Sequence, residues 1–334
     1  MPERYDVDTL AERLRRGERA ALSRAITLVE SRRGSDAALA DGLMARLPDA
    51  PPRPSSRRIG VTGSPGAGKS TLVEAYGERL LSAGHRVAVL AVDPSSNRTR
   101  GSILGDKTRM PTLSADDRAF VRPSPAGTTL GGVARATRRS IRLCEAAGYD
   151  RVLVETVGVG QSEHAVRDVC DCMALLVLPG GGDDLQGIKR GIVELADLVL
   201  VHKADGPRAE LARHTARDYR NALHLRAAGP DGAWSPRVTT GSSVAEGGLA
   251  SFAERLDAYF GHLGAEGLAA LRREQALRSF ERDWPERVVE VLRTREAFGR
   301  ALARTRADLS AGALDEDAAL RILTDIIANA PLAP

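Results

Sequence analysis

Short apolar runs alternate with segments of helical periodicity through the middle of the chain. Seven runs predict strands, at Arg58–Thr62, Val87–Val92, Ala119–Arg122, Arg151–Glu155, Met173–Leu178, Leu198–Val201 and Arg237–Thr239. Apolar residues three and four apart predict helices between them, including Thr71–Leu81, Gly132–Ala147, Leu185–Ala196 and Ala209–Leu225. This alternation predicts an α/β fold, in which helices cover both faces of a mostly parallel sheet. Ligands of such sheets bind at the carboxyl ends of the strands.

Two helical regions flank the alternating segment. Before it, the spacing predicts helices over Val7–Leu14, Ala20–Ser31 and Ala37–Leu47, followed by a Pro-rich linker at Pro48–Ser56. After it, the spacing predicts helices over Gln275–Arg293, Arg295–Arg306 and Ala318–Ile327. We therefore expect an N-terminal helical extension (1–50), a central domain (57–262) and a C-terminal helical arm (263–334). The residues of the arm fit packing against the domain and dimerisation equally well.

Composition narrows the class of protein. The 334 residues include 28% charged residues, with a net charge of +4, and the pI is about 9.2. The arginines are spread among acidic residues and only 4% of residues are aromatic, so we expect no nucleic-acid binding. Cys144, Cys170 and Cys172 favour a reducing compartment and core positions, because the Cys-x-Cys spacing is tighter than the usual redox or zinc motif. With no membrane-length apolar run and an acidic start, we expect a cytoplasmic protein.

Lysine usage points to the chemistry. The chain has 48 lysines and arginines, of which only four are lysines: Lys69, Lys107, Lys189 and Lys203. The run Gly63-Ser64-Pro65-Gly66-Ala67-Gly68-Lys69-Ser70 matches the phosphate-loop pattern G-x-x-x-x-G-K-S, between a predicted strand and a predicted helix that begins at Thr71. Its backbone N–H groups and the helix N-terminus attract phosphate, while Lys69 reaches the outer phosphates and Ser70 ligates Mg²⁺. The loop alone does not separate kinases, ATPases and GTPases.

Acidic residues follow successive predicted strands. Asp93 comes directly after one strand, and Glu155 ends another, where carboxylate oxygens can hold Mg²⁺. In nucleotide switches the N–H group of a glycine close after such an acid senses the γ-phosphate, and Gly158 is placed to do so. Asp205 follows a further strand and can accept hydrogen bonds from the N1–H and N2–H groups of guanine, which adenine does not present in that pattern.

Several motifs together resemble one family, the GTPase chaperones associated with methylmalonyl-CoA mutase, also called arginine/ornithine (LAO/AO or ArgK-type) transport ATPases. The resemblance covers roughly residues 10 to 330. It rests on Gly63–Ser70, Val92–Ser96, Gly101–Met110 (GSILGDKTRM), Arg122–Val133 (RPSPAGTTLGGV), Glu155–Glu163 (ETVGVGQSE) and Pro179–Gly191 (PGGGDDLQGIKRG), and runs on into Lys203–Gly206. GSILGDKTRM and ETVGVGQSE are far more specific than the phosphate loop.

The resemblance implies a P-loop NTPase of the SIMIBI class, a homodimer that hydrolyses GTP to GDP. Its hydrolysis gates adenosylcobalamin loading onto an acyl-CoA mutase and the protection or reactivation of that enzyme. Carried over by position, the Mg²⁺ ligands are Ser70, Asp93, Asp106 and Glu155. The catalytic candidates are Lys69, Glu155 and Gln161. Lys107 falls in the first switch. Asp183, Gln186 and Lys189 fall in a third switch, Pro179–Lys189, that relays nucleotide state to the partner.

The base-reading motif departs from the family pattern. Where Asn-Lys-x-Asp is usual, this chain has His202-Lys203-Ala204-Asp205, and neutral histidine has one donor and one acceptor with which to replace the asparagine. Ser242 and Ser243 stand for the companion Ser-Ala segment. We expect GTP to be preferred over ATP, with weaker affinity than in an asparagine-bearing homologue. The size of that effect stays open.

Two other functions use the same loop. One is a kinase or ATPase linked to basic amino-acid transport, which would transfer phosphate to an acceptor. The other is a metallochaperone GTPase for nickel enzymes, which typically carries His-rich or paired Cys ligands near its switches. The sequence leaves open which acyl-CoA mutase is served and which residue positions the attacking water. It has no D-x-H-x-x-G cobalamin signature, and direct contact with cobalamin is open too.

Overall fold

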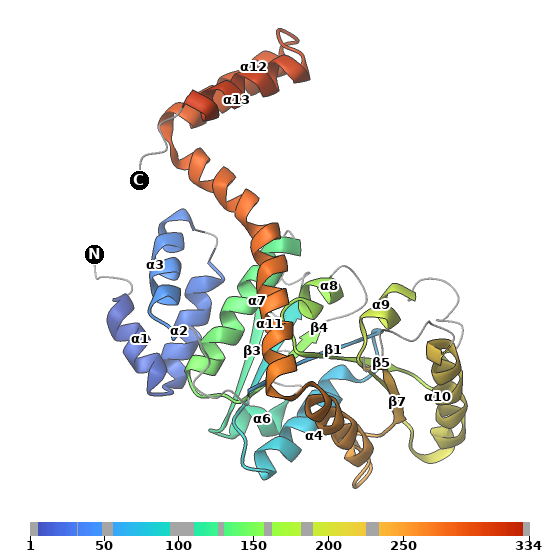
Figure 1. The fold of residues 1–334 in the computed structure, drawn as a ribbon. Helices are drawn as coiled ribbons and strands as arrows, with labels where there is room; N and C mark the ends of the chain where they lie inside the picture. Colours follow the sequence, from blue (N-terminus) through green and yellow to red (C-terminus); the bar gives the residue numbers. More distant parts are fainter. Residues whose placement is uncertain are drawn as a thin grey trace. The chain divides into compact units, whose positions relative to one another are not determined.

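A computed structural model describes residues 6–31, 33–48, 56–93, 110–125, 130–156, 162–181, 190–224 and 234–329. The chain divides into two compact units, Met1–Gln275 and Ala276–Pro334. The first contains the sheet and is built around it (Figure 1).

Seven parallel strands form the sheet, in the order β3-β2-β4-β1-β5-β6-β7. They are β1 (Arg57–Gly63), β2 (Val87–Asp93), β3 (Ala119–Pro125), β4 (Arg151–Thr156), β5 (Cys172–Val177), β6 (Leu198–Val201) and β7 (Arg237–Thr240). Every residue of β4, β5 and β6 is buried, as expected where helices cover both faces of a parallel sheet. The predicted α/β fold and all seven predicted strands are confirmed.

Side chains along β5 alternate between the two faces of the sheet and contribute to three hydrophobic clusters. Cys172, Ala174 and Leu176 face a core shared with α4 (Lys69–Ser82), α6 (Pro111–Ala115) and the start of α11 (Ala250–Thr294). Met173 packs in the opposite core, with α7 (Leu130–Ala146) and α8 (Ser162–Arg167). Leu175 packs with α9 (Arg190–Leu195) and α10 (Ala209–His224), which follows the short 3-10 helix η3 (Gly206–Arg208). The three buried cysteines all belong to these cores.

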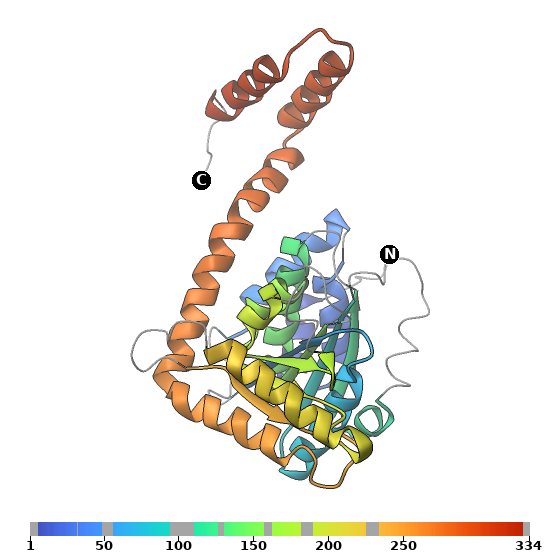
Figure 2. The ribbon, with the colours of Figure 1, turned by 90° about the vertical axis from the view of Figure 1, so that its right-hand side faces the viewer.

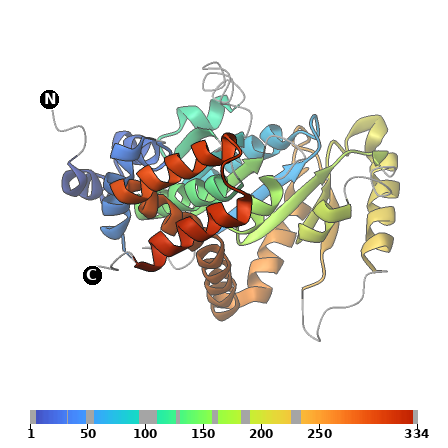
Figure 3. The ribbon, with the colours of Figure 1, turned by 90° about the horizontal axis from the view of Figure 1, so that it is seen from above.

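Three N-terminal helices extend the core that contains α7 (Figure 3). They are α1 (Val7–Arg15), α2 (Arg19–Val29) and α3 (Gly34–Ala45). Ion pairs support this packing, since Arg139 contacts Asp41 at 2.5 Å and Arg122 on β3 contacts Glu30, whose side chain is 5% exposed, at 2.8 Å. The N-terminal helices are therefore part of the first unit.

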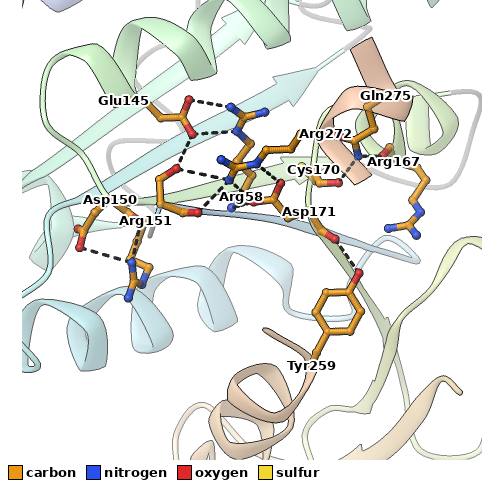
Figure 4. Close-up of polar contacts among 11 residues, drawn as sticks. Arg58, Glu145, Asp150, Arg151, Arg167, Cys170, Asp171, Tyr259, Arg272 and Gln275 are labelled. Atoms are coloured by element: carbon orange, nitrogen blue, oxygen red, sulfur yellow. Dashed lines mark hydrogen bonds and ion pairs between the residues drawn. The ribbon is translucent and has the colours of Figure 1, made fainter. Parts of the chain in front are cut away.

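A charged network lies at the amino ends of β1 and β5, whereas the phosphate loop follows the carboxyl end of β1. Figure 4 shows the contacts within this network. We call Arg58, Glu145, Asp171 and Arg272 the amino-end network. Arg58 donates two hydrogen bonds of 2.8 Å to Glu145, and the amide of Arg58 donates to Asp171 at 2.8 Å. Arg272 on α11 donates a hydrogen bond to each carboxylate oxygen of Asp171, at 2.8 and 2.6 Å.

Two uncharged side chains of α11 reinforce the same attachment. The Tyr259 hydroxyl donates to the carbonyl oxygen of Asp171 at 2.8 Å, and Gln275 Nε2 donates to that of Cys170 at 2.7 Å. The helix that was predicted to begin at Gln275 in fact begins at Ala250 and changes direction at Gly264, where φ is 58°. Its first part therefore belongs to the sheet-containing unit.

The second unit contains the end of α11, α12 (Glu296–Ser310) and α13 (Glu316–Asn329). The last two helices lie side by side (Figure 2). Large apolar side chains on the end of α11 are exposed at helical spacing: Leu277 (57%), Phe280 (65%), Trp284 (49%), Val288 (46%) and Val291 (46%). We call these five residues the α11 stripe. Over the described part of the chain, no helix combines the length and apolarity needed to span a membrane.

Candidate functional site

The phosphate loop connects the end of β1 to the start of α4. Gly63 has φ of 148°, and a Cβ atom there would lie 2.3 Å from the carbonyl oxygen of Leu176 on β5. Gly68 has φ of 91° and precedes the first residue of α4, Lys69. Both positions need glycine, because L-residues rarely adopt such angles and a side chain would collide with backbone at the first. The predicted loop therefore lies between a strand and a helix, with glycine at two positions whose backbone angles favour it.

Lys69 is held against its own loop. Its ammonium donates to the carbonyl oxygens of Gly63 at 2.8 Å and Ser64 at 3.2 Å, and the residue is 7% exposed. Burial lowers the pKa of Lys69 from its ordinary value, while the charges of Glu155 and Glu163 oppose that shift. An ammonium has three hydrogens, so the third remains for a phosphate oxygen.

Ser70 and Glu155 meet at the mouth of the loop. The Ser70 hydroxyl donates to Glu155 Oε1 at 2.7 Å, and Glu155 is 5% exposed. They meet because β1 and β4 are neighbours, with Val61 in register with Glu155. A hydroxyl and a carboxylate are oxygen ligands of the kind that Mg²⁺ binds beside a nucleotide, so this pair fits the predicted ion.

A cavity of about 500 Å³ opens over the loop. It is lined by Pro65, Gly66, Gly68, Lys69, Ser70, Thr71, Glu155 and Lys203. Phosphate-binding backbone, a cation and an acid–hydroxyl pair thus converge on one space. Across the described ranges, this site included, no three His, Cys, Asp or Glu side chains gather as a metal-binding group.

The predicted base-reading residues lie together beside the loop. Lys203, with φ of 56°, donates through Nζ to the carbonyl oxygen of Gly66 at 2.9 Å. Ser242 is buried and its hydroxyl donates to Asp205 Oδ1 at 2.7 Å. The amide of Ala204 donates to the carbonyl oxygen of Gly241 at 3.1 Å, which joins the segment after β6 to the segment after β7.

His202 is buried between the phosphate loop and the segment after β7. Its Nδ1 lies 2.8 Å from the carbonyl oxygen of Ala67, and its Nε2 lies 2.7 Å from Ser243 Oγ. Burial lowers the pKa of His202, outweighing the hydrogen bond to Ala67 that raises it. A Cβ atom on Gly68 would lie 2.7 Å from Nδ1, so the glycine also makes room for the imidazole.

Part of the predicted site lies outside the described residues. This holds for Asp106, Lys107, Gly158, Gln161, Asp183, Gln186 and Lys189. Asp93 ends β2, beside β4, and only its backbone is described. The structure therefore brings together the phosphate-loop residues, Glu155 and the five base-reading residues.

Two features of the site were not predicted from the sequence. Glu163, on α8, is fully buried and its charge acts on Lys69. The sequence feature that could have identified Glu163 is its position as the last residue of the ETVGVGQSE stretch. Thr62 and Thr156 share a 3.0 Å hydrogen bond that joins β1 to β4 just below the loop, and nothing in the spacing marks that pair.

Comparison with known proteins agrees with this geometry. The family model described as "Methylmalonyl Co-A mutase-associated GTPase MeaB" matches residues 22–297. The GTPase ArgK of Escherichia coli is 44% identical, over 96% of this chain and 97% of that protein. The mitochondrial methylmalonic aciduria type A homolog of Mus musculus is 45% identical, over 81% of this chain and 67% of that protein.

A solved structure described as a LAO/AO transport system kinase superposes with a TM-score of 0.71. It shares 36% sequence identity, and the match covers 97% of this chain and 98% of that chain. Because the family model spans most of the chain and the phosphate loop, acid–hydroxyl pair and base-reading residues are assembled, the chain belongs to the methylmalonyl-CoA mutase-associated GTPase (MeaB) family and is a P-loop GTPase.

Proposed function

We propose that this GTPase is a chaperone of an adenosylcobalamin-dependent acyl-CoA mutase. In this role, GTP hydrolysis gates cofactor loading and the protection or reactivation of the mutase. The observation that carries the proposal is the family match over residues 22–297, whose description names a methylmalonyl-CoA mutase-associated GTPase. The mouse relative, named for methylmalonic aciduria type A, supports the same partner class.

The described side chains suit GTP hydrolysis, in which water attacks the γ-phosphorus and the bond to the β–γ bridging oxygen breaks. Lys69 binds the outer phosphates with the hydrogen that its loop carbonyls leave available. Ser70 and Glu155 would hold Mg²⁺, together with Asp93 and Asp106 by sequence position. A bound Mg²⁺ supplies neutralisation of the charge on the β- and γ-phosphate oxygens. The water-positioning candidate is Gln161, six residues after Glu155.

The third switch is the proposed link to the mutase, with Asp183, Gln186 and Lys189 as its relay residues. Its described start is fixed to the domain, because the Gly180 amide donates to Thr215 Oγ1 on α10 at 2.9 Å. Thr215 is 2% exposed and Gly180 is exposed, so this anchor is partly buried. A rigid starting point lets nucleotide-dependent changes in the following segment be passed to a partner rather than absorbed by the domain.

The C-terminal arm is proposed as a homodimerisation element. The α11 stripe places apolar side chains three and four residues apart on one helix, and an exposed patch of this kind is typical of a protein interface. Trp284→Asp is expected to turn a dimer into a monomer in size-exclusion chromatography with light scattering. Glu281→Gln, at an exposed acid on the same helix, is the control. A wild-type monomer at all concentrations would contradict the proposal.

Steady-state GTP hydrolysis tests the chaperone role. The protein is assayed alone and with purified methylmalonyl-CoA, isobutyryl-CoA and ethylmalonyl-CoA mutases in turn. One mutase should accelerate turnover at least tenfold, and Lys189→Ala should lose that acceleration while it still binds GDP. Arg190→Ala, the adjacent cation, is the matched control. If no mutase changes the rate, the proposed partner class is wrong.

A second candidate is a kinase linked to basic amino-acid transport, since the 36% identical solved structure is described as a transport system kinase. That function predicts transfer of the γ-phosphate to an acceptor and does not require Asp205 to read guanine. Calorimetry with GDP and ADP separates the two, because equal affinities would favour the kinase. The nickel-chaperone alternative predicts Ni²⁺ binding, which calorimetry with Ni²⁺ tests; no observation on the described residues specifically favours it.

A further inference from the structure

The neutral imidazole ring of His202 has a single N–H group, which limits the hydrogen bonds that it can donate. A carbonyl oxygen only accepts, so the 2.8 Å contact with Ala67 places the ring hydrogen on Nδ1. In the neutral ring, Nε2 then has a lone pair and accepts the Ser243 hydroxyl hydrogen at 2.7 Å. The buried environment, which lowers the pKa of His202, favours this neutral form. Hydrogen bonds thus run from Ser243 through the imidazole to Ala67.

Both ring nitrogens are therefore engaged within the protein. Asparagine at this position has two amide hydrogens, so it can donate one to the loop carbonyl and a second to the base. Neutral histidine has a single N–H, and Ala67 takes it. His202 also cannot turn freely toward a ligand, because it is 2% exposed and its ring fills the space where a Cβ atom of Gly68 would lie.

Asp205 is placed to read the opposite edge of guanine. Ser242 donates to Oδ1 of this carboxylate at 2.7 Å, which fixes its orientation. Oδ2 and the remaining lone pair of Oδ1 can still accept from the N1–H and N2–H groups. The Lys203 ammonium is tied to Gly66 at 2.9 Å, which places its side chain alongside the phosphate loop.

We infer that His202 is a positioning residue that joins the phosphate loop to Ser243, and that no His202 hydrogen reads guanine N7. Selection of guanine over adenine is assigned to the Asp205 carboxylate. This inference concerns how the GTPase recognises its nucleotide and does not depend on the partner proposed above. It also predicts that asparagine at position 202 restores a contact that the native chain lacks.

The test compares GDP with 7-deaza-GDP, which has a C–H group in place of the N7 acceptor. In calorimetry the wild-type protein should bind the two within about twofold, because no donor is lost. A wild-type preference for GDP of fivefold or more would overturn the inference. This measurement needs no variant, so a folding defect cannot obscure it.

Two variants sharpen the result. His202→Asn should prefer GDP to 7-deaza-GDP by about five- to tenfold, the range of one neutral hydrogen bond. The same nucleotide ratio in His202→Asn as in the wild type would contradict the inference. Ser243→Ala should weaken GDP and 7-deaza-GDP equally, as expected if Ser243 acts by holding His202. IDP, which lacks the N2 amino group, should bind the wild type at least tenfold more weakly than GDP, because Asp205 then loses a donor.

Discussion

Arg272→Ala removes the cation that joins α11 to the amino ends of the strands. Arg272 donates to both carboxylate oxygens of Asp171 and to the carbonyl oxygen of Ser56 at 2.8 Å. The Asp171 side chain is fully buried. In the variant, the one described hydrogen-bond donor that its carboxylate keeps is the Arg58 amide. Breaking one side of a buried ion pair costs about 3–5 kcal/mol. Because the Arg58 amide stays in place, we expect the lower end, about 3 kcal/mol.

Urea denaturation of the nucleotide-free protein measures this loss directly. The melting temperature should also fall by roughly 6–12 °C, given about 2–4 °C per kcal/mol in domains of this size. Arg273→Ala is the matched control, since the neighbouring arginine on the same helix is exposed and should change stability by less than about 0.5 kcal/mol. When Asp171 is already replaced by asparagine, Arg272→Ala should lower the free energy of unfolding by less than half as much as it does in the wild type. Equal stability of the two arginine variants would refute the reasoning.

Three further predictions concern the nucleotide site. Gly68→Ala should weaken GDP binding at least tenfold and lower the free energy of unfolding by about 2–4 kcal/mol, because its Cβ atom would meet His202. Gly84 is the control, since it has a similar φ of 87° but open space around it. Gly84→Ala should lower the free energy of unfolding by only about 1–2 kcal/mol in denaturation. Ser70→Ala should leave GDP affinity in EDTA unchanged and abolish its increase with Mg²⁺ in calorimetry, whereas a retained increase would exclude Ser70 as a ligand. Burial lowers the pKa of His202 in the folded protein below its ordinary value of 6.5. Between the folded and unfolded pKa values, the unfolded chain binds a proton that the folded chain does not, so the free energy of unfolding should fall as the pH drops below about 6.5. In urea titrations across that range, His202→Asn should lack this part of the slope.

The sheet and the phosphate loop were predictable because their signals are local. A strand such as β5 is buried on both faces, so its apolar run is nearly continuous in the sequence. The phosphate loop needs glycine at Gly63 and Gly68 for reasons that are already present in its own backbone. The pairing of Ser70 with Glu155 follows from parallel strands that end at the same edge of the sheet.

The features that were missed depend on contacts between distant segments. Arg272 and Asp171 are 101 residues apart, and periodicity does not indicate which of many arginines will be buried. The helix before Gln275 was not predicted from the sequence, and the structure has Gly264 at a bend between two helical segments of α11. The bonds of His202 to Ala67 and Ser243 needed the two loops to be placed side by side.

The amino-end network also has a consequence for synthesis of the chain. Its last member, Arg272, is 216 residues after Ser56, so the two ends of this contact emerge from the ribosome at very different times. At about 5–20 residues per second, every strand of the sheet is made while Asp171 still lacks the guanidinium that neutralises it. Folding of the sheet-containing unit can therefore be completed only after the first part of α11 has been translated.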